Sequence, residues 1–169
     1  MIISVIGGSK AKPEHLALAE EVGQELGKRN VMVACGGLHG VMEAVCRGAK
    51  SAGSTTIGIL PGRTSKDANN YVDIPIVTTM GFSRNVIVVN TGDSVIAIGG
   101  AYGTLSEIAY ALADGIPVIA LNTWPLTVKG DGDPIENGMI EASNPVDAVE
   151  KALAAANARG NSYRPEVGG

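Results

Sequence analysis

The sequence predicts an α/β protein with a doubly wound, Rossmann-like fold of three layers and a mainly parallel sheet of about six or seven strands. Short, wholly apolar, β-branched runs alternate with helical segments along the 169 residues. Strands that are apolar throughout are typical of a parallel sheet with helices on both faces. Glycine pairs directly follow three of the apolar runs, where a strand must turn into a helix. No linker divides the chain, so residues 1–160 are expected to form one nucleotide-binding domain.

The first half of the chain predicts three strands with two helices between them, and the strands are expected over residues 2–6, 31–35 and 55–60. Pro13 suits the first turn of the first helix, because its missing N–H is not needed there. Apolar residues then recur at helical spacing as far as Asn30. The second helix contains residues 41–49, and Gly53 follows its end. Residues 63–73 are polar and predict a loop.

The second half predicts three further strands, over residues 74–78, 94–98 and 117–121. Residues 83–89 could form a strand, but their place between two better strands favours a crossover helix that Ser83 could cap. Further helices are expected over residues 104–114 and 146–158. Residues 124–138 are rich in proline and glycine and predict a mobile loop. Residues 161–169 are expected to form a poorly ordered tail.

Composition excludes several classes of protein. The net charge is −4, which argues against a general binder of nucleic acid or of membrane surfaces, since both attract basic proteins. No apolar run approaches the roughly 20 residues of a membrane span, and the start of the chain lacks the features of a signal peptide. Cys35 and Cys46 show no metal-binding spacing and are expected to be buried and reduced, as in a cytoplasmic protein. His15 and His39 are too isolated for a metal site, and His39 is expected at the surface.

The predicted ligand site centres on a glycine-rich turn that begins at Gly99. Such a turn, followed by the start of a helix, leaves backbone N–H groups available to a phosphate. Because the carboxyl ends of parallel strands meet at one edge of a sheet, the other glycine pairs should lie beside it. The pattern is neither GxGxxG nor GxxxxGK[ST], so a single phosphate, as in a nucleoside monophosphate, fits best. The expected phosphate-binding residues are Gly8, Ser9, Gly36, Gly37, Arg84, Gly99, Gly100, Gly103 and Thr104.

The residues near this turn that could act on a ligand each have a structural alternative. Thr104 and Glu107 have the spacing of a capping box. In the alternative interpretation, the Thr104 hydroxyl contacts phosphate and the Glu107 carboxylate faces a sugar. The carboxylate could then activate water or stabilise a cationic transition state. Arg84 could be a solvated surface charge, or its guanidinium could pair with the phosphate. Ser9 could donate to the ligand or cap the first helix. Arg84 and Glu107 are the candidate catalytic residues.

Taken together, these motifs resemble the Lonely Guy (LOG) superfamily, whose members were often labelled lysine decarboxylases. Residues 99–107, GGAYGTLSE, resemble its PGGxGTxxE signature. Further segments are similar to other parts of the family pattern, and these are residues 5–9, 35–43, 58–62 and 83–85. The resemblance covers about residues 1–122. It implies a Rossmann-like homodimer or higher homo-oligomer that binds nucleoside 5′-monophosphates, with Arg84 and Glu107 as catalytic residues and no metal or organic cofactor required.

Two departures from the signature point to one branch of the superfamily. Ile98 replaces its proline, and Asn85 replaces the lysine that follows the arginine. Both resemble the branch of the molybdenum cofactor carrier proteins, in which the same edge of the sheet holds a phosphorylated pterin. Three functions therefore stay open: a phosphoribohydrolase that cuts the base–ribose bond, a carrier of a phosphorylated molecule such as molybdenum cofactor, and a scaffold with a vestigial pocket. Nothing marks a pyridoxal phosphate lysine, since Lys66 and Lys129 both fall in predicted loops.

Overall fold

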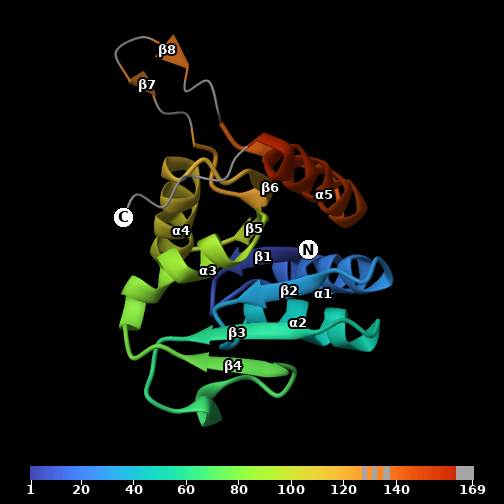
Figure 1. Ribbon diagram of the computed structural model, residues 1–169, viewed down its shortest axis with the longest axis vertical. Helices are drawn as coiled ribbons and strands as arrows, with labels where there is room; N and C mark the ends of the chain where they lie inside the picture. The colour runs from blue at the N-terminus through green and yellow to red at the C-terminus, as the bar shows by residue number, and fades with distance from the viewer. Residues whose placement is uncertain (127–128, 131–132, 135–137, 163–169) are drawn as a thin grey trace.

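The computed structural model describes residues 1–126, 129–130, 133–134 and 138–162, and its centre is a seven-stranded sheet (Figure 1). All neighbouring strands of this sheet pair in parallel, in the order β4-β3-β2-β1-β5-β6-β9. The strands are β1 (Ile2–Gly7), β2 (Met32–Cys35), β3 (Thr56–Leu60), β4 (Ile74–Val77), β5 (Ser94–Gly99), β6 (Val118–Thr123) and β9 (Ile140–Glu141). The predicted Rossmann-like fold is confirmed.

Five helices complete the three layers, and they are α1 (Pro13–Lys28), α2 (Val41–Ser51), α3 (Asn85–Thr91), α4 (Tyr102–Ala113) and α5 (Pro145–Ser162). Helices α1, α2 and α5 share one hydrophobic core with one face of the sheet. Helices α3 and α4 share a second core with the opposite face. The chain winds outward from β1 to β4 and then returns to place β5 on the other side of β1. Ligands of open α/β sheets bind at such a switch point.

Helices α1 and α2 approach each other unusually closely through two glycines. A Cβ atom on Gly48 would lie 2.0 Å from the carbonyl oxygen of Glu20, and one on Gly23 would lie 2.2 Å from that of Val45. Side chains at these positions would therefore separate the two backbones. The close contact packs α1 against α2 on one face of the sheet.

The turn at Gly99 differs from the prediction, because α4 begins at Tyr102 and not at Thr104. Gly99 and Gly100 have φ values of 55° and 123°, which only glycine adopts readily, and this sharp turn lets the helix begin two residues early. Ala101 is the N-cap, without a side-chain hydrogen bond. The capping-box interpretation of Thr104 and Glu107 is therefore wrong.

Other helix starts also lack the caps that we considered. The N-cap of α1 is Lys12, so Ser9 does not cap this helix. A short 3₁₀ helix, η2 (Gly81–Arg84), precedes α3, whose N-cap is Arg84 and not Ser83. The crossover helix itself is confirmed, since α3 connects β4 to β5.

The remaining segments include four short elements that the sequence analysis did not predict. A 3₁₀ turn, η1 (Ser65–Asp67), lies in the loop after β3, and β9 adds a seventh strand. The predicted loop over 124–138 contains an antiparallel pair, β7 (Lys129–Gly130) with β8 (Asp133–Pro134). Helix α5 continues to Ser162, and most of the predicted tail lies outside the described residues. None of the described helices is long and apolar enough to cross a membrane.

Candidate functional site

The turns after β1, β2 and β5 meet at the carboxyl edge of the sheet, as the sequence predicts. The carbonyl oxygen of Gly8 accepts a hydrogen bond from the backbone N–H of Val41 at 3.1 Å, which joins the first turn to the second. A Cβ atom on Gly8 would lie 3.8 Å from the Cα of Gly100, which places the first turn against the third. The three turns therefore form one continuous backbone surface.

Arg84 and Glu107 lie together beneath this surface. The Arg84 Nη1 atom is 3.7 Å from Glu107 Oε1, and each residue is only 7% exposed. Arg84 Nη2 donates to the carbonyl oxygen of Gly36 at 3.4 Å. A Cβ atom on Gly36 would lie 2.5 Å from this nitrogen, so glycine is what lets the guanidinium reach the turn after β2. The alternative of a solvated surface charge at Arg84 is therefore wrong.

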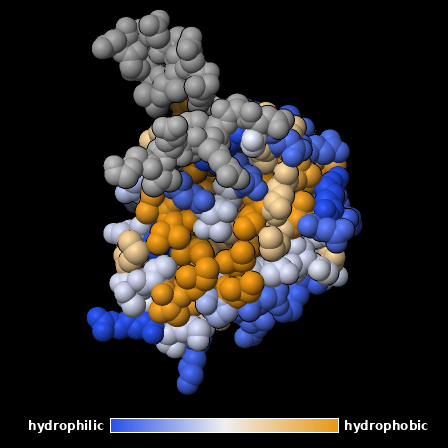
Figure 2. All heavy atoms as spheres, in the orientation of Figure 1, coloured by the Kyte–Doolittle hydropathy of each residue, from blue (hydrophilic) through white to orange (hydrophobic). Residues whose placement is uncertain are grey.

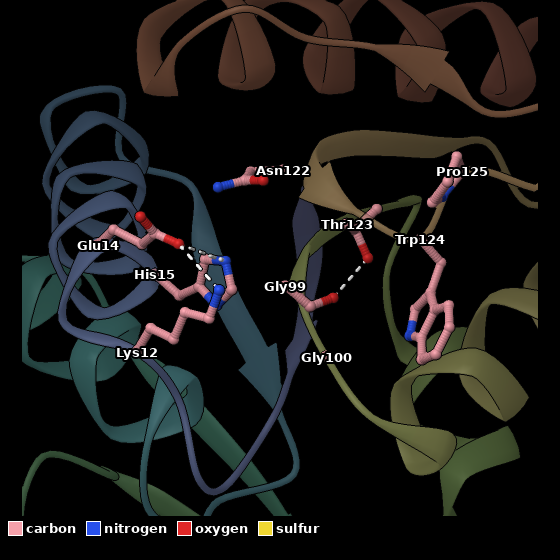
Figure 3. Close-up of a pocket in the computed structure, with 9 residues that line it drawn as sticks. All are labelled: Lys12, Glu14, His15, Gly99, Gly100, Asn122, Thr123, Trp124 and Pro125. Atoms are coloured by element: carbon pink, nitrogen blue, oxygen red, sulfur yellow. Dashed lines mark hydrogen bonds and ion pairs between the residues drawn. The ribbon is translucent and has the colours of Figure 1, made fainter.

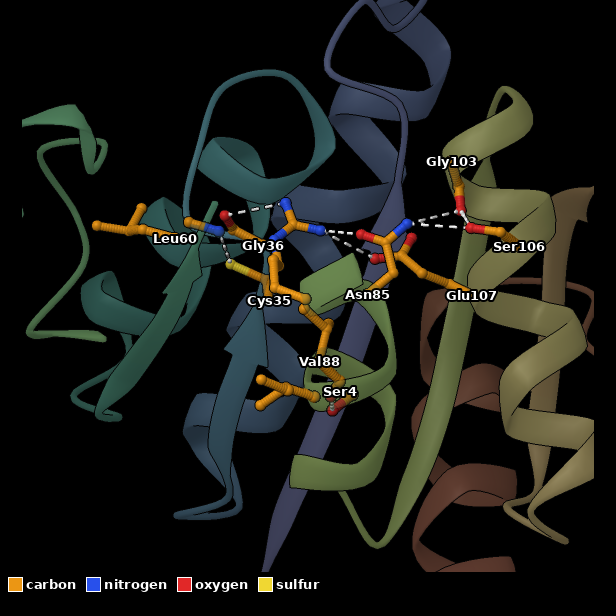
Figure 4. Close-up of polar contacts among 12 residues, drawn as sticks. Ser4, Cys35, Gly36, Leu60, Asn85, Val88, Gly103, Ser106 and Glu107 are labelled. Atoms are coloured by element: carbon orange, nitrogen blue, oxygen red, sulfur yellow. Dashed lines mark hydrogen bonds and ion pairs between the residues drawn. The ribbon is translucent and has the colours of Figure 1, made fainter. Parts of the chain in front are cut away.

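Asn85 connects this ion pair to the first turn of α4 (Figure 4). Its side-chain oxygen accepts a hydrogen bond from Arg84 Nη1. Its side-chain nitrogen donates to the carbonyl oxygen of Gly103 at 3.4 Å and to Ser106 Oγ at 3.0 Å. A lysine here could not accept from a guanidinium, because an ammonium carries only donors. The replacement of the family's lysine by Asn85 therefore allows a hydrogen bond from Arg84 that a lysine could not accept.

Burial changes the electrostatics of the pair. It raises the pKa of Glu107 to about 7, although the Arg84 guanidinium acts in the opposite direction. Burial also lowers the pKa of Arg84, against the smaller effect of Glu107. Arg84 Nε is buried and has no hydrogen-bond partner among the described residues. An unpaired buried donor is costly, so this atom is suited to an acceptor that enters from outside the chain.

The other predicted phosphate-binding residues differ in how accessible they are. Ser9 and Gly100 are exposed, and Gly8 and Gly103 are half-buried. Gly36 and Gly37 are buried, as is Gly99. Thr104 is 3% exposed and packs against Gly100, where an added Cβ would lie 2.6 Å from the Thr104 Cβ. The accessible backbone is therefore concentrated on Gly8, Ser9, Gly100 and Gly103.

A pocket of about 320 Å³ lies at the Gly99–Gly100 turn, between the start of α1 and the end of β6 (Figure 3). It is lined by Lys12, Glu14, His15, Gly99, Gly100, Asn122, Thr123, Trp124 and Pro125. The sequence analysis assigned only the two glycines of this set to a site. Asn122 to Trp124 lie at the carboxyl end of β6. Because the carboxyl ends of parallel strands meet at one edge of the sheet, the sequence could have assigned these residues to the site as well. His15 was considered only as a metal ligand.

The remaining candidate residues are the two cysteines and His39, and of these Cys35 borders the site, since its sulfur accepts a hydrogen bond from the backbone N–H of Gly37 at 3.3 Å. Cys35 and Cys46 are buried and unbridged, with their sulfur atoms 3.5 Å apart. His39 is exposed, as expected, and its ring lies 3.3 Å from the Glu43 carboxylate. In the described part of the chain, no three histidine, cysteine, aspartate or glutamate residues cluster as metal ligands would.

Comparison with known proteins identifies the family of this chain. The family model that matches residues 1–151 is that of the SLOG cluster4 family. The chain belongs to the SLOG cluster4 family. An uncharacterized protein of Archaeoglobus fulgidus is 43% identical over 130 residues, which are 77% of this chain and 85% of the relative.

Some relatives of this SLOG cluster4 protein carry functional names, and two of them are described here. The cytokinin riboside 5′-monophosphate phosphoribohydrolase of Mycobacterium tuberculosis is 32% identical over 126 residues, 68% of this chain and 67% of that protein. The structure of the molybdenum cofactor binding protein of Rippkaea orientalis has a TM-score of 0.80 and 36% identity, and the match covers 90% of this chain and 95% of the other. The resemblance to the LOG-like superfamily and to its carrier branch is confirmed.

Proposed function

We propose that this SLOG cluster4 protein binds a phosphorylated small molecule, with the phosphate on the backbone surface formed by the three glycine turns. The single observation that carries the proposal is the unpaired Nε of the buried Arg84 beneath these turns. A guanidinium N–H and several backbone N–H groups together suit a phosphate. The exposed Ser9 hydroxyl and the backbone of Gly100 and Gly103 supply further donors from the accessible side.

The two named relatives support the same ligand class. A phosphoribohydrolase of cytokinin riboside 5′-monophosphates acts on a nucleotide, and molybdenum cofactor is a phosphorylated molecule. The net charge of −4 favours neither nucleic acid nor a membrane surface as a partner. A nucleoside 5′-monophosphate in the cytoplasm therefore remains our first proposal for the ligand.

The proposed reaction is hydrolysis of the bond between the base and C1′ of the ribose. Glu107 would take a proton from water, whose oxygen attacks C1′, while the C1′–N bond breaks and its electron pair leaves with the base, which is then protonated. A carboxyl group with a pKa of about 7 is well matched to proton transfer near neutral pH. Arg84 would orient the ligand through its phosphate. This chemistry requires neither a metal nor an organic cofactor.

A carrier without catalysis is the second candidate, and one observation favours it. Arg84 and Glu107 are each only 7% exposed, and Asn85 ties Arg84 to α4. A sugar would have to open this cluster before Glu107 could approach C1′. The 36% identity to the molybdenum cofactor binding protein of Rippkaea orientalis supports the same candidate.

The test is a binding and turnover measurement on the wild type, Glu107→Gln and Arg84→Lys. We expect AMP and ribose 5-phosphate to raise the melting temperature of the wild type, because a ligand that binds only the folded state stabilises it. Arg84→Lys should weaken this effect, since a lysine cannot replace the buried Nε donor. Failure of every phosphate-bearing ligand to stabilise the protein would leave only the scaffold hypothesis.

Turnover distinguishes the enzyme from the carrier. Free adenine released from AMP by the wild type, and lost in Glu107→Gln while AMP still binds, would support hydrolysis. Stabilisation by AMP without release of adenine would support the carrier. Glu107→Gln is a matched variant because it keeps the shape of the side chain while removing its ability to exchange a proton and its negative charge toward Arg84.

A further inference from the structure

We propose that Asn69 and Thr123 are positioning residues that orient the backbone of two glycine turns toward an anion. Each side chain binds carbonyl oxygens of one turn, so that the N–H groups of the same peptide units stay available to a phosphate. The inference rests on the proposed binding of a phosphorylated molecule. It adds two residues, neither of them a candidate from the sequence, that make the turns select an anion.

Asn69 holds the turn that follows β2. It lies in the segment between β3 and β4 and is only 5% exposed. Its side-chain nitrogen donates to the carbonyl oxygens of Gly37 at 3.2 Å and of Leu38 at 2.8 Å, and its backbone N–H donates to the Gly37 carbonyl at 2.9 Å. Its side-chain oxygen accepts a hydrogen bond from the backbone N–H of Tyr71 at 3.0 Å. The amide is therefore bound at both ends, and its orientation is fixed.

Thr123 holds the turn that follows β5 (Figure 3). Its hydroxyl donates to the carbonyl oxygen of Gly99 at 2.5 Å. Thr123 is half-buried at the end of β6, the strand next to β5 in the sheet. Gly99 and Gly100 have no side chains to restrict their backbone. The hydroxyl therefore supplies a fixed contact where the turn has none of its own.

The N–H groups opposite the bound carbonyls are without partners. In a trans peptide unit, the C=O of one residue and the N–H of the next point in opposite directions, and no cis peptide bond occurs in the described part of the chain. The N–H groups opposite the three bound carbonyls belong to Leu38, His39 and Gly100. Within the described residues, none of the three donates a hydrogen bond. Leu38 is half-buried, and the other two residues are exposed.

This arrangement favours an anion. A free carbonyl oxygen at these positions would repel a phosphate oxygen, whereas the bound carbonyls leave only donors, and successive N–H groups in a turn form an anion-binding surface. Donors that are fixed before binding also lose little freedom when the ligand arrives. The carbonyl oxygens of Gly36 and Gly103 are likewise occupied, by Arg84 and Asn85. The same principle therefore extends to the cluster beneath the turns.

Thr78 provides a matched control within the chain. Its hydroxyl donates to the carbonyl oxygen of Leu60 at 2.7 Å, and Thr78 is half-buried like Thr123. The residue after Leu60 is Pro61, which has no N–H. The same hydrogen bond therefore orients no donor here, and its loss should leave anion binding unchanged.

The test measures the affinities of inorganic phosphate and ribose 5-phosphate by calorimetry. Thr123→Val removes the hydroxyl and should weaken both about fivefold, which corresponds to one neutral hydrogen bond. Thr123→Ser keeps a hydroxyl and should retain most of the affinity, and Thr78→Val should bind like the wild type. In amide NMR spectra, phosphate should shift the Gly100 N–H resonance in the wild type and in Thr123→Ser, but much less in Thr123→Val.

Asn69→Ala tests the other turn. The backbone N–H of residue 69 would still hold the Gly37 carbonyl, so the phosphate-induced shift should be lost chiefly at the His39 N–H and kept at the Gly100 N–H. An unchanged His39 response would overturn the role of Asn69. Circular dichroism shows whether the variants fold, and the Thr123 variants decide the inference if Asn69→Ala does not.

The outcomes separate this inference from the proposed function. Unchanged affinity in Thr123→Val, an equal loss in Thr78→Val, or no recovery in Thr123→Ser overturns the inference while the proposed function stands. Failure of the wild type to bind either probe overturns both.

Discussion

At the scale of single residues, Glu107 combines burial with a nearby positive charge. Burial favours its neutral form more strongly than Arg84 favours its ionised form, so its pKa rises to about 7 from 4.5. The folded protein therefore keeps a proton on Glu107 at pH values where the unfolded chain has already lost it. Because the folded state binds more protons than the unfolded state at these pH values, the free energy of unfolding falls as pH rises.

We predict that the free energy of unfolding contains a component from Glu107 that falls as pH rises from about 4.5 to 7. Over this window the folded state binds more protons than the unfolded state, and the loss amounts to roughly 3 kcal/mol for this one group. Glu107→Gln cannot titrate and should lack this component. Urea unfolding of both proteins at several pH values measures the difference, which should be constant above about pH 7.

Parallel curves for the wild type and Glu107→Gln across that window would contradict the prediction. The other ionisable groups of the chain are present in both proteins, so their contributions cancel in the comparison. The subtraction thus isolates the single carboxyl group.

The sequence predicted where Arg84 and Glu107 lie but not how they are held. Both follow strands whose carboxyl ends share one edge, so their proximity follows from topology. Their burial depends on the missing side chain at Gly36, which leaves room for the guanidinium. It depends also on Asn85, which joins α3 to a helix 18 residues away along the chain. Such long-range contacts leave no local pattern in a sequence.

At the scale of elements, the type and the order of the longer helices and strands were predicted correctly. Each of them contains enough apolar residues to show a periodic pattern. The elements that the sequence analysis missed or misplaced were either very short or depended on the backbone conformation of glycine. Strand β9 has two residues, too few for a periodic pattern. The start of α4 moved to Tyr102 because consecutive positive φ angles at Gly99 and Gly100 allow a tighter turn than we expected.

The crossing of α1 and α2 gives a prediction at this scale. Gly48→Ala should destabilise the protein by about 1–3 kcal/mol, because its Cβ would lie 2.0 Å from a backbone oxygen of α1 and the helices would have to separate. Gly160→Ala in α5 is the matched control, since no atom of the part of the chain that the structure describes lies within 4 Å of its added Cβ. It should be neutral or slightly stabilising. Denaturant midpoints measure both, and equal stabilities of the two variants would contradict the prediction.

At the scale of the whole molecule, the face that carries α3 and α4 is incompletely covered. The register pairs Ile57 with Ile74 and Ile59 with Ile76, so these side chains point to the same face as α3. Among the described residues no helix covers them at the edge strand, and Ile74 and Ile76 are 46% and 43% exposed. Figure 2 shows apolar residues gathered over the part of this face that is in view.

The charge distribution on this face favours a second copy of the chain as the partner. Within α3 and α4, Glu107 is the only charged residue, and it is buried. Phe82 and Tyr102, near the N-termini of these two helices, are 85% and 83% exposed. A face that is apolar and uncharged pairs well with a copy of itself, and isologous contacts of this kind close into dimers. We propose that the expected homo-oligomer forms through this face.

The oligomer prediction can be tested with size-exclusion chromatography and light scattering. We expect the wild type to have about twice the 17.2 kDa mass of one chain or a higher multiple. Phe82→Asp combined with Tyr102→Asp should yield a species of one chain with unchanged circular dichroism, because two buried charges would oppose association. Val146→Asp, which alters an exposed apolar residue of α5 on the other face, should leave the oligomer intact. Since the same face ends at the Arg84–Glu107 cluster, loss of the oligomer together with unchanged affinity for ribose 5-phosphate would place the ligand within a single chain.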